Sequence, residues 1–144
     1  MNTVKKMTCI TMIALLTTFS CKAQSAEEKS ITSTIENFAK AGDLYDVEKL
    51  ADYLDPNYRI IMNQLFGSTE TAILTRAVYL DKIMKKEFGG DDRKVTVSNI
   101  IINGNTASAL VKFTGKQMIS TNIVVLLKDK TGHWLLVSDL PVIQ

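Results

Sequence analysis

Asp139 is the acidic side chain that is best placed to carry chemistry in this sequence. It follows Val137 by two residues, so in a regular strand it shares a face with Leu135 and Val137. If that face lines a cavity, partial desolvation would prepare the carboxylate to act as a base or to anchor a ligand. The alternative is an aspartate in solvent beside Pro141 at the end of the strand. We favour this alternative, because charged side chains are seldom buried without a partner.

Two tyrosines, Tyr58 and Tyr79, are the next candidates, because each joins an aromatic ring to a polar tip. In a pocket their hydroxyls could orient a ligand by hydrogen bonding. As core residues whose hydroxyls reach water, they would need no ligand, and the sequence leaves both interpretations open. Met62 and Phe66 could line the mouth of a cavity, although Met also fills gaps in ordinary cores.

The sequence offers little for metal or cofactor chemistry. His133 is the only histidine, and its place beside Gly132 predicts an exposed turn residue rather than a base. One histidine and at most one cysteine in the mature chain argue against a dedicated zinc site. Because there is also no glycine-rich phosphate loop and no nucleophile elbow, we expect no cofactor.

Apolar residues with helical spacing predict two helices at the start of the folded part. The first occupies 25–40 and is ended by Ala41-Gly42-Asp43. The second is shorter, begins near Val47 and is stopped by Asp55-Pro56-Asn57. A third helix is expected after a short hairpin, and Thr75 is a suitable N-cap for it.

This third helix is expected to carry Val78, Tyr79, Ile83 and Phe88 and to end at Gly89-Gly90. A start at Ser68 is the alternative. The hairpin before it consists of a strand over 58–63 and a short strand over 71–74.

From Arg93 onward the apolar pattern has a period of two, which predicts strands. Asn103-Gly104 is a hairpin signal, and the strand after it has small residues near its start and Phe113 farther on, so the sheet could curve around a cavity. The run over 123–127 is apolar at every position, which suits a strand buried on both faces. A polar turn separates it from a last strand in which Trp134 is a core anchor. The sequence therefore predicts an α+β domain with helices packed on one face of a curled antiparallel sheet.

Four stretches in this order resemble the nuclear transport factor two-like superfamily, and most closely its branch labelled lumazine-binding. They are AGDLYDVEKLADYLDPNYRI at 41–60, TRAVYLDKI at 75–83, INGNTASALVKF at 102–113 and LLKDKTGHWLLV at 126–137. The resemblance implies a cone-shaped domain with a central pocket between helices and sheet, often dimerising through the outer sheet face. Ketosteroid isomerases and polyketide cyclases of this fold place Asp, His or Tyr in the cone, and this sequence lacks a clear version of that set.

The N-terminus has the pattern of an export signal, which we expect to occupy 1–24. Lys5 and Lys6 precede an apolar run that is too short to span a bilayer. Ala23-Gln24-Ser25 has the small-x-small spacing of an ordinary signal peptidase site, and cleavage there would give ordinary secretion. Cleavage before Cys21 would give a lipidated protein, and we slightly favour lipidation. The protein would then be a lipoprotein of the periplasm or outer membrane, with a lipid anchor as its only membrane contact.

Charge argues against nucleic acid as a partner. The chain has 17 Lys and Arg against 15 Asp and Glu, and the surplus consists of Lys5 and Lys6 in the leader. From Cys21 onward the formal charge is therefore zero, which removes the electrostatic motive for binding nucleic acid.

We expect residues 25–144 to form a single exported, non-catalytic domain that binds a small apolar or aromatic molecule. Seven residues are candidates for the ligand site: Tyr58, Met62, Phe66, Tyr79, Ile83, Phe113 and Asp139. One alternative is an isomerase- or cyclase-type enzyme that uses Asp139 and a pocket tyrosine. Another is a structural or interaction module that acts as a homodimer.

Surplus apolar surface predicts such a homodimer, packed sheet to sheet. If Ala107 to Phe113 presents alternate residues to the helices, Leu110 must point away from them. On the preceding strand, either Ile101 or the pair Ile100 and Ile102 points outward. On the following strand, Val124 and Leu126 join the outer face if Val125 faces inward. A patch of that size usually marks an interface.

Overall fold

The computed structural model describes residues 24–144. The lipidation candidate Cys21, and all of the expected export signal except Gln24, lie outside the described residues. Within 24–144, no helix combines the length and the apolar character that a membrane span needs.

Within the described residues, three helices and six strands follow one another in the predicted order, so the α+β class is confirmed. In chain order they are α1 (Ala26–Asp43), α2 (Val47–Ala51), β1 (Leu54–Asn63), β2 (Thr71–Thr75), α3 (Arg76–Met84), β3 (Lys94–Asn103), β4 (Thr106–Thr114), β5 (Ile119–Lys128) and β6 (Trp134–Ile143).

The strands form one curved, open sheet in the order β2-β1-β6-β5-β4-β3. Four of its neighbour pairs are antiparallel, as predicted, but β1 and β6 run parallel. This exception follows from the chain path: after β2 and α3 the chain crosses to the far edge at β3. Three successive antiparallel steps then bring β6 back beside β1, running in the same direction as β1.

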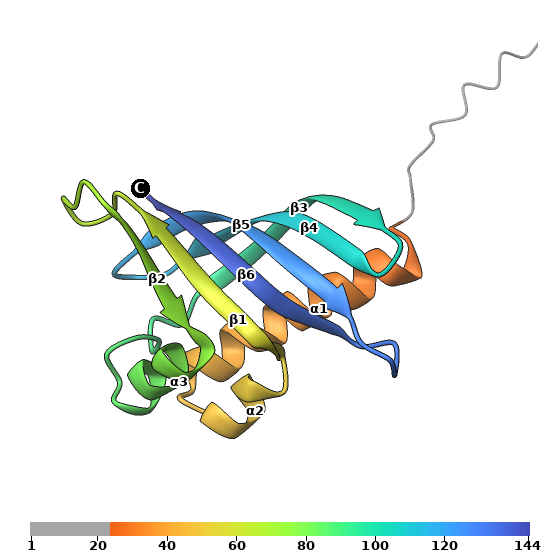
Figure 1. The fold of residues 1–144 in the computed structure, drawn as a ribbon, viewed down its shortest axis with the longest axis horizontal. Coiled ribbons are helices and arrows are strands. Elements are labelled where there is room, and N and C mark those ends of the chain that lie inside the picture. Colours follow the sequence, from red (N-terminus) through yellow and green to blue (C-terminus); the bar gives the residue numbers. More distant parts are fainter. Residues whose placement is uncertain (1–23) are drawn as a thin grey trace, which may run out of the picture.

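Helix α1 crosses the inner face of the sheet, while α2 and α3 lie near the β1 and β2 end (Figure 1). The start of α1 is fixed by a capping box, in which the Ser25 side chain accepts a hydrogen bond from the backbone N–H of Glu28 and the Glu28 side chain accepts one from the backbone N–H of Ser25. Ile31, Ile35 and Phe38 form its buried stripe. Trp134 is buried too, which confirms it as a core residue of the last strand.

The third helix begins where the sequence predicts but ends early. The Thr75 hydroxyl accepts a hydrogen bond from the backbone N–H of Val78, so Thr75 is the N-cap. The helix ends at Met84, whereas the prediction carried it to Gly89. Lys86 takes the left-handed conformation (φ 60°), and its backbone N–H donates to the carbonyl of Ile83. The backbone N–H of Glu87 then donates to the carbonyl of Lys82. Such a closure usually has glycine at the left-handed position. Phe88 consequently lies in the loop after α3.

The second helix is also shorter than predicted, because Leu54 to Asn57 belong to β1. Asp55 accepts a hydrogen bond from the backbone N–H of Asn57, and Pro56 between them suits an extended chain. Leu54 pairs with Leu136 of β6, so these residues are part of the sheet and not of the helix.

The structure shows which apolar residues of the central strands lie on the outer face of the sheet, where the homodimer contact was predicted. Val124 and Leu126 are fully buried on the inner face, so the condition under which they would join the outer face is not met. Ile123 is 52% exposed and Ile101 is 65% exposed, and both lie on the outer face. Leu110 pairs with Ile123 across the β4–β5 ladder and shares that face. The predicted homodimer itself stays a prediction.

Candidate functional site

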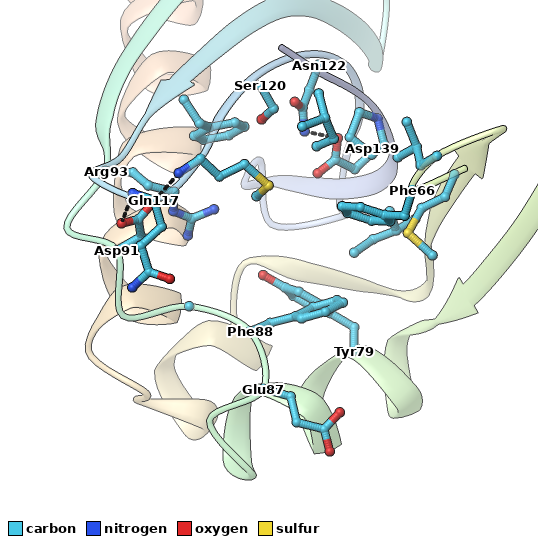
Figure 2. A pocket seen from close by; sticks show the side chains of 18 residues that line it. Phe66, Tyr79, Glu87, Phe88, Asp91, Arg93, Gln117, Ser120, Asn122 and Asp139 are labelled. Carbon is cyan, nitrogen blue, oxygen red and sulfur yellow. Dashed lines mark hydrogen bonds between the residues drawn. The ribbon is translucent and has the colours of Figure 1, made fainter. Parts of the chain in front are cut away.

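A cavity of about 400 Å³ opens between the inner face of the sheet, helix α3 and the loops after α3 and β4 (Figure 2). Its walls are largely apolar, with a few polar groups among them. The lining residues are Ile60, Met62, Leu65, Phe66, Tyr79, Glu87, Phe88, Gly89, Asp91, Arg93, Phe113, Gln117, Met118, Ser120, Asn122, Asp139, Pro141 and Ile143.

Asp139 reaches this cavity because β6 contains a bulge. Val125 pairs with Ser138 and Leu126 pairs with Leu136, so Val137 is an extra residue in the ladder. The bulge shifts the side-chain alternation by one, and Asp139 therefore lies on the inner face with Leu136. It does not share a face with Leu135, as a regular strand would require. The favoured expectation that Asp139 lies in solvent is wrong, since it is only 6% exposed.

The Asp139 carboxylate has one hydrogen-bonded oxygen and one that faces the cavity. The side-chain amide of Asn122 donates to Oδ1 at 2.7 Å, and both residues are buried. Oδ2 is not hydrogen-bonded by any described residue, and Figure 2 shows this oxygen turned toward the open space. Burial raises the pKa of Asp139 from 3.8 to about 6, although the Asn122 hydrogen bond and the charge of Arg93 both lower it.

Arg93 forms part of the opposite wall, but its charge is already engaged. Its Nε lies 3.0 Å from Asp43 Oδ1, and its Nη2 donates to the carbonyl of Ala39. The guanidinium also lies 5.2 Å from the centre of the Phe113 ring. Because the Asp43 and Arg93 side chains are both largely buried, this ion pair fixes the end of α1 to the start of β3.

Asp91 fixes the loop that forms one edge of the cavity. Its carboxylate accepts hydrogen bonds from the backbone N–H groups of Lys116, Gln117 and Met118. Desolvation alone would raise the pKa of Asp91, but these three hydrogen bonds bring it below its usual value. Gly115 leaves room for this contact, because a Cβ there would lie 1.7 Å from Asp91 Oδ2.

The two tyrosines occupy different positions. Tyr79 lines the cavity from α3, whereas Tyr58 is buried beneath it, with the ring centres 5.5 Å apart. Burial raises the pKa of both hydroxyls, and the negative charge of Asp139 adds to this rise. Among the described residues, the buried hydroxyl of Tyr58 finds no hydrogen-bond partner.

The structure brings five of the seven candidate residues to the cavity: Met62, Phe66, Tyr79, Phe113 and Asp139. Tyr58 and Ile83 instead belong to the buried core. Phe66 is 80% exposed and stands at the rim of the cavity in the β1–β2 connection. His133 lies in the exposed turn before β6, as predicted.

Sequence reasoning missed several polar residues of the site. Asn122 precedes the buried Val124 by two residues and so shares its face, but the apolar run over 123–127 left the direction of Val124 open in the sequence. Arg93 and Asp91 had no signal in the sequence, since their partners Asp43 and residues 116–118 are distant in the chain. In the described part of the chain, no three His, Cys, Asp or Glu side chains lie close enough together to hold a metal ion.

At the level of sequence, the chain matches no family model and no curated protein. Solved structures do share its fold. An NTF2-like protein of unknown function from Shewanella baltica OS155 is 19% identical with a TM-score of 0.70, and the match covers 82% of this chain and 94% of that one. An NTF2-like protein of unknown function from Silicibacter pomeroyi DSS-3 is 16% identical with a TM-score of 0.70, covering 82% and 96%.

A ketosteroid isomerase-like protein from Erwinia carotovora atroseptica SCRI1043 is 13% identical with a TM-score of 0.63, and the match covers 83% of this chain and 97% of that one. At these identities the likeness concerns the fold, and the chain has the NTF2-like fold.

Proposed function

We propose that this protein is an exported binding protein that holds a small, largely apolar or aromatic molecule in the cavity beside α3. The cavity itself supports this proposal. Its volume of about 400 Å³ falls in the usual range for small-molecule sites, and it combines aromatic and aliphatic walls with a few converging polar groups. The basic and apolar start of the sequence supports export.

Neutral aromatic probes test the binding proposal. Indole and 2-naphthol should shift the NMR signals of Met62, Phe88 and Phe113 and should raise the melting temperature of the purified protein. Ser120→Leu fills the cavity from β5 and should abolish these effects. Thr121→Leu is the matched control, because the neighbouring residue points to the outer face. Absence of binding by the wild-type protein would refute the proposal.

Export is tested by the mass of the protein purified from its native cells. Acyl chains on Cys21 support the lipoprotein route, and an N-terminus at Gln24 or Ala26 supports ordinary secretion. An intact Met1 on the cellular protein would refute export.

An isomerase- or cyclase-type reaction is the second candidate, because Asp139 and Tyr79 line one cavity and the pKa of Asp139 is about 6. A general base is most effective when its pKa lies near the working pH. The reaction class predicts that the protein exchanges the α-protons of a cyclic ketone in D₂O, and that Asp139→Asn abolishes this exchange. If wild type and variant exchange equally slowly, the catalytic version is excluded.

A further inference from the structure

The charged groups that line the cavity are mostly acidic. Glu87, Asp91 and Asp139 contribute carboxylates, and Arg93 is the one basic group among the lining residues. Asp43 already pairs with Arg93, so Arg93 offers little attraction to a ligand anion. A negatively charged ligand that enters this space would therefore meet more acidic than basic groups.

Asp139 differs from the other two acids in having no strong partner. Glu87 pairs with Lys82 at 2.7 Å, and Asp91 is satisfied by three backbone N–H groups. Asp139 receives only the Asn122 amide on one oxygen and turns the other into the cavity. Its side chain is more than nine-tenths buried, and a buried carboxylate is costly unless a cation or further donors compensate it.

The aromatic walls suit a cation as well. Tyr79 and Phe88 lie across the cavity from Asp139, and Phe66 stands at its rim (Figure 2). The faces of such rings attract a positive charge, and the attraction grows where water is excluded. An ammonium group that leaves water for this site would therefore gain a carboxylate on one side and aromatic rings on the other.

We propose that the cavity selects organic ammonium ions, in which a protonated amine pairs with Asp139 and an aromatic or aliphatic body fills the apolar part. This inference rests on the proposed binding function and narrows it to a ligand class. A neutral donor could reach the same oxygen, but it would leave the charge of the carboxylate uncompensated. An ammonium ion compensates this charge on binding, and its remaining N–H groups can donate to neighbouring acceptors.

Three probes of one shape separate these cases: tryptamine, tryptophol and indole-3-propionate carry an ammonium, a hydroxyl and a carboxylate on the same indole body. Titration calorimetry on the purified wild-type protein at pH 7.5 measures each dissociation constant. We expect tryptamine to bind at least tenfold more tightly than tryptophol, and indole-3-propionate to bind most weakly.

Asp139→Asn tests whether this preference comes from the carboxylate. The variant keeps the side-chain shape and should still bind tryptophol, which reports that its cavity is intact, but its tryptamine-to-tryptophol preference should fall to about one. Glu48→Gln removes an exposed charge on α2 and should leave the preference unchanged. The wild-type ranking tests the inference even if Asp139→Asn does not fold.

The results also separate the two proposals. If tryptophol binds wild type as tightly as tryptamine, or if Asp139→Asn retains the preference, the ammonium inference is overturned and the binding function stands. If neither these probes nor indole and 2-naphthol bind, both proposals fail.

Discussion

Replacing Asp139 by Asn should stabilise the protein at high pH and have little effect at low pH. The pKa of Asp139 is about 6 in the folded protein against an ordinary value of 3.8. Since one pKa unit corresponds to about 1.4 kcal/mol, ionising this buried group costs the folded state about 3 kcal/mol. The folded protein holds the proton more tightly than the unfolded chain. The contribution of protonated Asp139 to the free energy of unfolding is therefore fully present below about pH 3.8 and is lost as the pH rises through about 6.

Asn cannot ionise, so the variant should exceed wild type by about 3 kcal/mol at pH 8 and by less than about 1 kcal/mol at pH 4. The neighbouring Tyr58 and Tyr79 do not titrate in this window, because burial raises the pKa of both hydroxyls.

Urea unfolding, followed by Trp134 fluorescence at half-unit steps between pH 4 and pH 8, measures the difference at each pH. The Glu48→Gln variant, which alters an exposed residue of α2, should follow the wild-type curve. A stability difference between Asp139→Asn and wild type that is the same at pH 4 and pH 8 would refute the reasoning, because it would show that the pKa of Asp139 is the same in the folded and the unfolded protein.

Three further predictions concern the loop, the core and the outer face. Gly115→Ala should lower the melting temperature by several degrees, because its Cβ would collide with Asp91; an unchanged melting curve would argue against the Asp91 contact. Tyr58→Phe should leave stability unchanged or raise it by about 1 kcal/mol in urea unfolding, because it removes a buried hydroxyl without a partner; a clear loss would indicate that the hydroxyl is hydrogen-bonded. Sedimentation should show a homodimer that Leu110→Lys or Ile123→Lys weakens, and a wild-type monomer would contradict the proposed interface.

Local signals were sufficient to predict the element order. Asn103-Gly104 marks a hairpin and Thr75 caps α3, as the sequence predicts, because each acts within a few residues. The end of α3 was predicted at the glycines, yet Lys86 takes the left-handed position instead. Sequence preference favours glycine there, but other residues adopt this conformation when hydrogen bonds close the helix end.

The polar part of the site could not be predicted, because it depends on contacts between distant residues. Arg93 and Asp43 are 50 residues apart in the chain, with α2, the first hairpin and α3 between them. The loop at 116–118 is placed by Asp91, about 25 residues earlier. Neither pairing has a periodicity or a spacing that a single sequence reveals.

The position of Asp139 depends on a single extra residue in a strand. With the regular alternation of a strand, Asp139 would share a face with Leu135, and its carboxylate would lie outside the cavity. The bulge at Val137 reverses this alternation, so the same sequence places Leu136 and Asp139 on the inner face. The bulge lies in the pairing of β6 with β5, between the Val125–Ser138 pair and the Leu126–Leu136 pair. The acidic group of the cavity is therefore a consequence of how two strands align, and its chemistry follows from that alignment.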